Sequence, residues 1–514
     1  MNGAESLVET LVGCGVEVCF ANPGTSEMHF VAALDRVPGM RPILALFEGV
    51  VTGAADGYGR MAGKPAATLL HLGPGLANGL ANLHNARRAS TPIVNIVGDH
   101  ATYHAQYDAP LASDIMGFAR PVSGWVHSSP SARTVAADAA RAVQAAMEPP
   151  GQIATLILPA NSAWEEAEGP ATPLAPIKPA QVSSARVDEI AKALGEGKKS
   201  AILIRGAALQ PHGLEMAGRI AAKTGARLLC DTFAPRIARG AGIVAVERIP
   251  YFAEQIVDFL KDLDHLVLVG AKPPVSFFAY PGKPSWCVPE GCKLHTLAHP
   301  HEDGVSALDA LVEAVRATKD VSNRAEFKLP GLPSGNLDAF SAAQAIAQLM
   351  PENAIVSDEA ATSGLSVGMF TATAHPHDHL ALTGGSIGQG LPVATGAAIA
   401  CPNRKVVCLH GDGGAMYTVQ SLWTQAREKL DVTNVIFSNR SYAILKIELM
   451  RVGAGNPGPR ALSMFDIGDP KLGWVQLAQG MGMEATRAET AEEFSAQFAD
   501  AMKHKGSRLI EVVL

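Results

Sequence analysis

Two oxygen-bearing side chains follow consecutive apolar segments in the C-terminal third of the sequence. Asp412 lies in the Gly-rich turn GDGG at 411–414, directly after an apolar strand, and Asn439 follows the next apolar run, 432–437. Residues 416–429 have helical spacing, so both side chains are expected at the carboxyl ends of neighbouring strands of one βαβ unit, where ligands bind. A carboxylate and an amide oxygen suit Mg²⁺, and glycines let backbone N–H groups approach phosphate oxygens. The segment therefore predicts a diphosphate site bridged by a metal ion.

A lone carboxylate lies in an apolar part of the N-terminal region. Glu48, in the segment ALFEGVV at 45–51, stands between an apolar strand and the helical stretch 50–61. Desolvation disfavours the ionised form of a carboxyl group in apolar surroundings, which keeps a proton available for transfer. A role at the N-terminus of the helix explains an isolated Glu equally well. These residues alone leave both explanations open.

Together, these segments resemble thiamine diphosphate (ThDP) enzymes of the branch that contains acetolactate synthase and benzoylformate decarboxylase. That family has Gly-Asp-Gly followed, one helix later, by an Asn-Asn pair, and a Glu followed by the pattern A-[DE]-G-Y-x-R, which here reads AADGYGR at 54–60. The resemblance implies that Asp412, Asn439 and the backbone carbonyl of Ser441 bind Mg²⁺. It also implies that Glu48 shares a proton with the aminopyrimidine ring of the cofactor. One departure is that the first Asn of the pair is Ser438.

Two further polar residues follow strands near Glu48. Thr25 lies in NPGTSE at 22–27, and His71 lies in LLHLGPG at 69–75, so all three strand ends could open on one crevice. Benzoylformate decarboxylase is similar in having a hydroxyl residue and a His at these places, whereas acetolactate synthase has T-S-G-P-G. Because His titrates near neutrality, it suits proton transfer, although a buried structural His is the alternative. We therefore predict Glu48, His71 and Thr25 as catalytic residues.

Two more histidines are weaker candidates for proton transfer. His100 and His104 lie in the segment GDHATYH at 98–104, which follows another apolar run.

The resemblance also indicates residues that contact the cofactor. Ile387, in GGSIGQGLP at 384–392, corresponds to the bulky aliphatic residue that supports the bent conformation of ThDP, although ordinary core packing predicts the same burial. Glu359 is expected near the diphosphate. The predicted cofactor-binding residues are Gly24, Glu359, Gly384, Ile387, Gly411, Gly413 and Gly414. The expected cofactors are ThDP and Mg²⁺. We expect no FAD, because the middle region has no convincing counterpart of the FAD-binding motifs.

Apolar runs alternate with helical stretches along the chain, which predicts βαβ units and parallel sheets covered by helices. Two Pro-rich segments, 163–179 and 328–335, predict linkers. We therefore expect an α/β fold with three doubly wound parallel-sheet domains, at 1–165, 181–320 and 336–514. The length of 514 residues agrees with three domains of roughly 150 residues each. The resemblance implies that these domains bind the pyrimidine, form a middle domain and bind the diphosphate.

The composition narrows the class of partner. A net charge of −7 gives no basic surface for nucleic acid or an anionic membrane. Residues 380–403 carry no charge, but Gly, Pro and polar residues interrupt them, so a buried loop and helix are expected rather than a membrane span. Residues 1–5 show no signal-peptide pattern, so a cytoplasmic location is expected. Family sites lie between two subunits, which implies a homodimer or homotetramer with sites at the subunit interface.

The resemblance implies decarboxylation of a 2-oxo acid, followed by protonation or carboligation of the enamine. Unlike acetolactate synthase, the segment 442–448 lacks the Trp that helps to select a second substrate, and unlike benzoylformate decarboxylase, the segment 274–282 lacks a second His. Phe277, Phe278 and Leu449 could line an apolar substrate pocket, although core packing explains them equally well. The alternative to a ThDP-dependent 2-oxo acid enzyme is a cofactor-binding but inactive or regulatory homologue.

Overall fold

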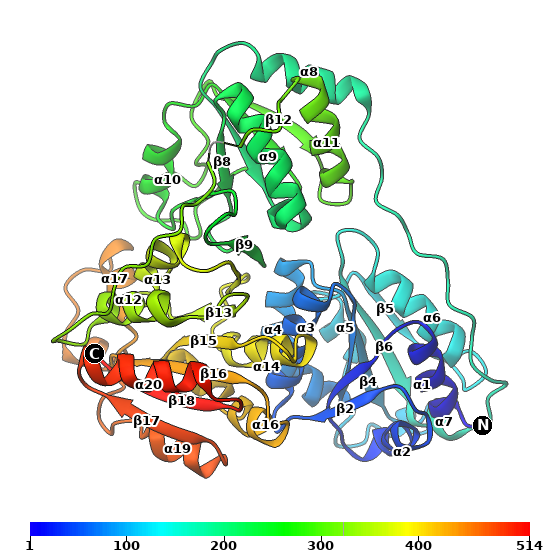
Figure 1. The fold of residues 1–514 in the computed structure, drawn as a ribbon. Coiled ribbons are helices and arrows are strands. Elements are labelled where there is room, and N and C mark those ends of the chain that lie inside the picture. The colour runs from blue at the N-terminus through cyan, green and yellow to red at the C-terminus, as the bar shows by residue number, and fades with distance from the viewer. Residues whose placement is uncertain (322) are drawn as a thin grey trace.

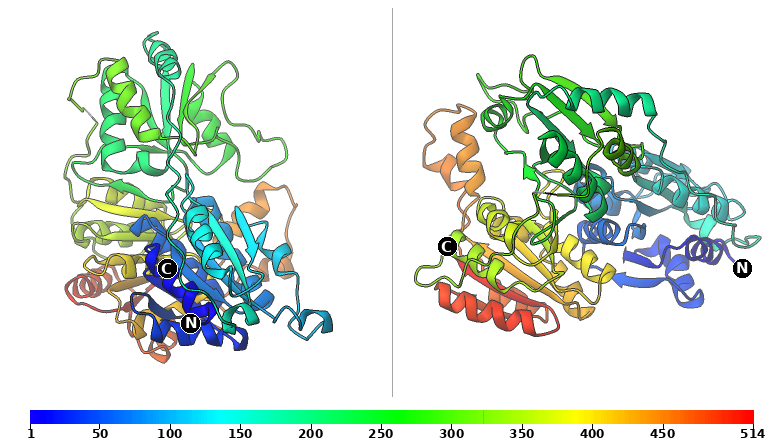
Figure 2. Two further views of the ribbon diagram at one scale, coloured as in Figure 1. Left: turned by 90° about the vertical axis from the view of Figure 1, so that its right-hand side faces the viewer. Right: turned by 45° about the horizontal axis from the view of Figure 1, so that its top comes forward.

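The computed structural model describes residues 1–321 and 323–514. It contains three separate β-sheets, each flanked by helices, and so confirms the predicted α/β fold with three parallel-sheet domains (Figure 1). The middle domain lies above the other two in this view, and the chain between α7 (Ala160–Trp164) and α8 (Ser184–Leu194) runs along the outside of the molecule to reach it (Figures 1 and 2).

The first domain has a six-stranded parallel sheet in the order β2-β1-β3-β4-β6-β5. Its strands are β1 (Val18–Asn22), β2 (Arg41–Leu44), β3 (Ala66–Leu70), β4 (Ile93–Asp99), β5 (Trp125–Ser128) and β6 (Ile153–Pro159). Its helices are α1 (Gly3–Gly13), α2 (Met28–Arg36), α3 (Glu48–Ala62), α4 (Leu72–Ala89), α5 (Ile115–Ala119), α6 (Val135–Ala146) and α7, with the short 3-10 turns η1 (Thr25–Glu27) and η2 (Ala105–Tyr107).

The middle domain has a five-stranded parallel sheet in the order β10-β8-β7-β11-β12. Its strands are β7 (Ser200–Ile204), β8 (Arg227–Cys230), β10 (Glu247–Arg248), β11 (His265–Val269) and β12 (Lys293–Ala298). Its helices are α8, η3 (Gly206–Leu209), α9 (Pro211–Thr224), α10 (Ala253–Leu260) and α11 (Gly304–Ala314).

The third domain has a seven-stranded sheet in the order β17-β18-β16-β15-β13-β14-β9. Its strands are β13 (Ile355–Glu359), β14 (His377–Ala381), β15 (Val406–Gly411), β16 (Val432–Ser438), β17 (Glu484–Ala488) and β18 (Arg508–Val513), together with β9 (Ile237–Arg239). Its helices are α12 (Ala339–Leu349), α13 (Leu365–Phe370), η4 (Thr371–Thr373), α14 (Gly390–Ala400), α15 (Asp412–Ala415), η5 (Met416–Thr418), α16 (Ser421–Arg427), α17 (Ala443–Arg451), α18 (Pro459–Ser463), α19 (Trp474–Gly480) and α20 (Ala491–Lys503).

Two features of the third domain differ from the sequence expectations. Strand β9 comes from the middle region of the chain and pairs antiparallel with β14, so this sheet is not wholly parallel. The helix expected at 416–429 is divided into η5 and α16. A three-residue strand carries too little periodicity to be recognised in the sequence.

Helices α3 and α14 pack against each other and join the first domain to the third. A Cβ at Gly396 would lie 1.8 Å from the backbone oxygen of Ala54, so only glycine permits this approach. Apart from its last residue, α14 is buried, and it forms the helical part of the uncharged stretch 380–403. Within the described chain, every helix is too short or too polar to cross a bilayer.

A buried ion pair holds the same interface. Arg60 donates to both carboxylate oxygens of Asp56, at 2.8 and 2.6 Å, and also to the backbone oxygen of Ala381 at 2.8 Å. Gln389 and Thr91 donate to Asp56 as well. The AADGYGR segment therefore joins two domains, and its charges face other protein groups.

Candidate active site

The predicted residues of the first domain lie at one edge of its sheet. Strands β2, β1, β3 and β4 are adjacent and parallel, so their carboxyl ends face the same way. Thr25, Glu48, His71 and His100 each follow one of these strands. The order of the strands therefore brings together residues that are far apart in the sequence.

His71 forms a hydrogen-bonded pair with Glu27, a residue to which the sequence analysis gave no role. The Nδ1 atom of His71 lies 2.8 Å from Oε2 of Glu27, and the same oxygen accepts the backbone N–H of Gly24 at 2.7 Å. Glu27 is fully buried, and burial raises the pKa of its carboxyl group. A Cβ at Gly24 would lie 2.3 Å from Nδ1 of His71, so glycine at 24 makes room for the ring. Contact with an ionised Glu27 would keep the proton on Nδ1 and leave Nε2 as an acceptor.

Glu48 is the first residue of α3 and is 7% exposed. Its Oε2 atom accepts a hydrogen bond from Nδ2 of Asn78 at 3.0 Å. The Oε1 atom lies 3.3 Å from the position of a Cβ at Gly75, and Glu48 makes no ion pair with the described residues. The carboxyl group is therefore buried, held by one neutral donor and free at its other oxygen. The sequence offered no signal for Asn78, because its distance from Glu48 is set by tertiary packing.

The remaining candidates of this domain differ in exposure. Thr25 is exposed in the single chain. His100 has a buried Nε2 without a hydrogen-bond partner in the described chain, and its ring centroid lies 5.4 Å from that of the exposed His104.

Asp412 connects the ends of two neighbouring strands of the third domain. Its residue is 3% exposed, Oδ2 accepts the backbone N–H of Arg440 at 2.7 Å, and Oδ1 accepts that of Gly413 at 2.9 Å. Burial raises the pKa of this carboxyl group. Asn439 is the first residue after β16, and its Oδ1 accepts the backbone N–H of Ser441 at 3.0 Å. Asp412, Asn439 and Ser441 thus lie in two turns that are hydrogen-bonded to each other.

The neighbouring glycines differ in the space around them. A Cβ at Gly411 would meet no heavy atom within 4 Å, whereas one at Gly413 would collide with Tyr442 and one at Gly414 would lie 2.9 Å from His410. The turn is therefore open at Gly411 and closely packed at the two residues that follow Asp412.

Glu359 holds the loop that precedes α14. Its two carboxylate oxygens accept the backbone N–H groups of residues 388, 389 and 390, each at 2.6 Å. The same loop contains Gly384, which lies against Asn85 and His84 of α4, and Ile387, which is 36% exposed. Ile387 is therefore not an ordinary core residue within one chain.

The predicted residues fall into two groups within one chain. The first contains Gly24, Thr25, Glu48 and His71, and the second contains Asp412, Asn439 and Ser441. No hydrogen bond or ion pair among residues 1–321 and 323–514 connects a member of one group to a member of the other. The described residues also contain no group of three or more His, Cys, Asp or Glu side chains placed to hold a metal. The predicted ligands, a carboxylate, an amide and a backbone carbonyl, do not require such a group.

Family models match both groups of residues. Residues 1–118 match the model described as "Thiamine pyrophosphate enzyme, N-terminal TPP binding domain", and residues 363–512 match "Thiamine pyrophosphate enzyme, C-terminal TPP binding domain". The chain belongs to the thiamine pyrophosphate enzyme family. The predicted resemblance is therefore confirmed, and ThDP is the cofactor that defines this family.

Relatives of this thiamine pyrophosphate enzyme span its whole length. It is 55% identical to a Mycobacterium tuberculosis protein named "Putative acetolactate synthase large subunit IlvX", covering 100% of this chain and 99% of the relative. It is 28% identical to benzoylformate decarboxylase of Pseudomonas aeruginosa, over 97% of this chain and 96% of the relative. It is 25% identical to the acetolactate synthase isozyme 1 large subunit of Escherichia coli, over 99% of this chain and 93% of the relative. A 4-hydroxybenzoylformate decarboxylase of Rhodococcus jostii has the same fold, with a TM-score of 0.86 at 22% identity over 100% of this chain and 99% of that one.

A separate crevice of about 910 Å³ lies at the carboxyl ends of the middle-domain strands. An ion pair between Arg205 and Asp231 lies in it, and Phe277 lines it beside Phe233 and Tyr251, with ring centroids 5.8 and 5.4 Å away. Crevices at this place in open α/β sheets commonly bind ligands. The expectation that this family member binds no FAD remains a prediction.

Proposed function

We propose that the chain is a ThDP- and Mg²⁺-dependent enzyme that decarboxylates 2-oxo acids and then protonates or carboligates the product. Its similarity to proteins named as benzoylformate decarboxylase and acetolactate synthases supports this reaction class. The main structural support is Glu48, a buried carboxyl group with one oxygen free and no ion pair among the described residues.

The proposed catalytic residues of the first domain would move protons. When bound, ThDP supplies a carbon nucleophile and an electron sink for the decarboxylation. Glu48 would exchange a proton with the cofactor through Oε1, the oxygen that makes no hydrogen bond with the described residues. His71, oriented through Nδ1 by Glu27, offers Nε2 for proton transfer, and Thr25, which follows the neighbouring strand β1, would supply a hydroxyl group.

The third domain provides oxygen ligands that fit a magnesium ion. Asp412, Asn439 and the backbone carbonyl of Ser441 are the hard donors that Mg²⁺ prefers, and the open space at Gly411 leaves room for phosphate oxygens. Ser438 does not remove a ligand, because it is a buried residue at the end of β16 whose carbonyl accepts the N–H of Leu514. The adjacent Asn439 carries the amide oxygen.

The complete site would need two copies of the chain. The Glu48 and Asp412 groups are not joined within one chain, and large apolar side chains are exposed near both. Leu46 (47% exposed) precedes Glu48, Tyr107 (69%) follows β4, and Met450 (73%) lies in the last turn of α17, the helix after Ser441. We propose a homodimer or a larger homo-oligomer, and light scattering of the intact protein checks it: a fully active monomer would contradict a site shared between subunits.

The test compares Glu48→Gln with wild type. Wild type should release CO₂ from at least one member of a 2-oxo acid panel in the presence of ThDP and Mg²⁺. Glu48→Gln should lose roughly 10²–10⁴-fold in rate, the usual contribution of general acid–base catalysis, while still binding ThDP in calorimetry. Glu17→Gln, which breaks an exposed ion pair with Lys64, is the control and should retain full activity.

A different result of the same comparison would support the alternative function. If wild type and Glu48→Gln bind ThDP equally and are both inert across the panel, the chain is an inactive or regulatory homologue. If wild type releases CO₂, analysis of products with and without an aldehyde or keto acceptor distinguishes protonation from carboligation.

A further inference from the structure

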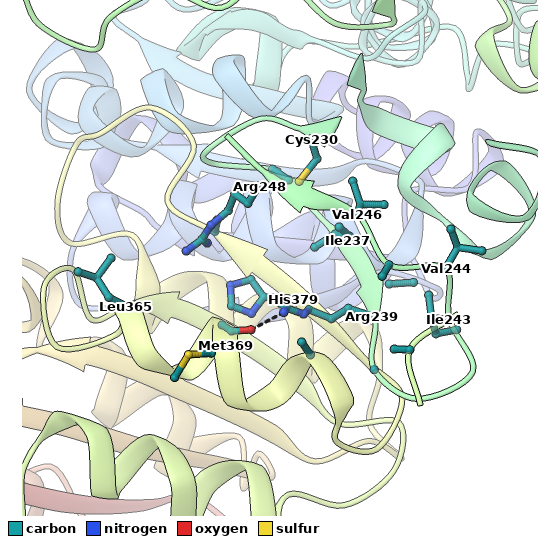
Figure 3. Close-up of a pocket in the computed structure, with 18 residues that line it drawn as sticks. Cys230, Ile237, Arg239, Ile243, Val244, Val246, Arg248, Leu365, Met369 and His379 are labelled. Atoms are coloured by element: carbon teal, nitrogen blue, oxygen red, sulfur yellow. Dashed lines mark hydrogen bonds between the residues drawn. The ribbon is translucent and has the colours of Figure 1, made fainter. Parts of the chain in front are cut away.

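A cavity of about 280 Å³ lies between the middle and third domains, and neither Glu48 nor Asp412 lines it. Its walls come from residues 230–248 of the middle region and from α13 and β14 of the third domain (Figure 3). Its volume lies just below the ~300–1,000 Å³ of sites for drug-sized ligands, so it suits a small molecule.

Two arginines from short strands of different sheets line this cavity. The side chain of Arg239, at the end of β9, donates a hydrogen bond to the backbone oxygen of Gly368. The side chain of Arg248, at the end of β10, makes no hydrogen bond or ion pair with the described residues. A Cβ at Gly368 would lie 3.7 Å from a terminal nitrogen of both guanidinium groups. The two side chains therefore converge on one position, which is the arrangement that a carboxylate between two arginines requires.

The charges around this position do not balance. The described residues along the cavity wall include no carboxylate, and the acidic residue whose charge interacts with both arginines is Asp358, whose Oδ2 lies 3.4 Å from Nε2 of His379. Burial, and then the charge of Arg248, lower the pKa of Arg239 to about 10, so it remains charged at neutral pH. His379 is 2% exposed and neither ring nitrogen has a hydrogen-bond partner in the described chain, while burial lowers its pKa and keeps it neutral. Two positive charges thus face one negative charge, which leaves an excess of one.

The rest of the cavity wall is aliphatic. Ile237 and Val244 from the middle region and Leu365 and Met369 from α13 line it around the arginines and His379 (Figure 3). A free inorganic ion would leave this apolar surface without a partner, whereas an aliphatic group would cover it.

We propose that this cavity binds a small aliphatic monocarboxylate. Its carboxylate lies between Arg239 and Arg248, within reach of His379, and its aliphatic part lies against Ile237, Val244 and Met369. The single negative charge of the ligand balances the one excess positive charge of the cavity. The two guanidinium groups provide N–H donors for both oxygens of the carboxylate.

The test measures binding of 3-methylbutanoate to the ThDP- and Mg²⁺-loaded protein by calorimetry. We expect saturable binding that 3-methylbutanamide, which has the same shape without the charge, does not show. Arg248→Met should weaken binding at least tenfold, because it removes a charge-assisted donor but keeps an apolar stem. Arg227→Met is the control: Arg227 also lies in the middle domain but pairs with Glu247 and does not line the cavity, so binding should be unchanged.

A second variant keeps both arginines and their charges. Gly368→Ala places a methyl group where the two guanidinium groups converge, at a distance that causes no clash with them, and should abolish binding. The proposal is overturned if 3-methylbutanoate does not bind saturably, if both variants bind it as wild type does, or if the amide binds equally. Tighter binding of inorganic phosphate than of the carboxylate would also overturn it.

Discussion

Replacing Glu27 by Gln tests whether the buried pair in the first domain directs proton transfer by His71. The carboxylate of Glu27 contacts Nδ1 of His71 at 2.8 Å and accepts the N–H of Gly24 at 2.7 Å. A hydrogen bond to a charged group contributes about 1.5–3 kcal/mol, and each ~1.4 kcal/mol is a factor of ten in rate. Gln keeps the size and one acceptor oxygen, so we expect Glu27→Gln to lower the rate of CO₂ release by about tenfold.

The decisive readout is the protonation of the ring itself. In wild type, ¹⁵N NMR of labelled His71 should show that the neutral form of the ring carries its proton on Nδ1, because Nδ1 faces the carboxylate of Glu27. Glu27→Gln should give a mixture of tautomers and an altered pH–rate profile. The matched control Glu17→Gln should change neither, since Glu17 pairs with Lys64 at the surface. An unchanged rate together with an unchanged tautomer in Glu27→Gln would refute the orienting role of Glu27.

Glu27→Gln should change the thermal stability of the protein in the opposite direction to its activity. Burial raises the pKa of Glu27 in the folded chain above its value in the unfolded chain. The folded state therefore holds this proton more tightly, and the stability that comes from the protonated group is present at acidic pH and lost as pH rises through the folded pKa. Because Gln is neutral, it does not carry the cost of burying a charged carboxylate at pH 7. Glu27→Gln should thus melt at the same or a higher temperature than wild type at neutral pH, and a marked fall in Tm would show that the ionised carboxylate stabilises the fold.

Two other substitutions test the metal site and the domain interface. Asp412→Asn should weaken Mg²⁺-dependent ThDP binding at least tenfold in calorimetry without lowering Tm, because Asn removes the negative charge that would bind the cation. Unchanged affinity would refute the ligand assignment. Arg60→Met leaves Asp56 buried without its partner and should lower the free energy of unfolding by about 3–5 kcal/mol in denaturant titration. Arg36→Met, at the exposed pair with Glu5, should lower it by less than about 1 kcal/mol. Equal losses of stability in the two variants would contradict the argument from burial.

The sequence could predict which residues follow strands, because apolar runs and the turns after them are local features. Thr25, Glu48 and His71 follow strands in the structure as expected, and so do Asp412 and Asn439. The alternation of strands and helices also predicted parallel sheets, which the structure has apart from the antiparallel strand β9.

The contacts that orient these side chains could not be predicted. Glu27 meets His71 across 44 residues of sequence, and Asn78 meets Glu48 across 30. Such contacts depend on helix rotation and strand order, which hydrophobic periodicity does not encode. Asp56 and Arg60 show the converse case: their i, i+4 spacing suggests an ordinary surface pair, but the packing of α3 against the third domain buries both charges.

The end of strand β13 lies between the proposed carboxylate cavity and the loop 384–390, which is proposed to contact the cofactor. Asp358 and Glu359 are consecutive, and side chains alternate along a strand, so they face opposite sides of the sheet. Asp358 lies beside His379, which lines the cavity, whereas Glu359 holds the backbone of residues 388–390 before α14. A ligand bound beside His379 therefore lies on one side of this two-residue segment, and the loop carrying Ile387 lies on the other. Because coupling between two binding sites is reciprocal, whatever change this ligand makes in ThDP affinity must equal the change that ThDP makes in the affinity for the carboxylate.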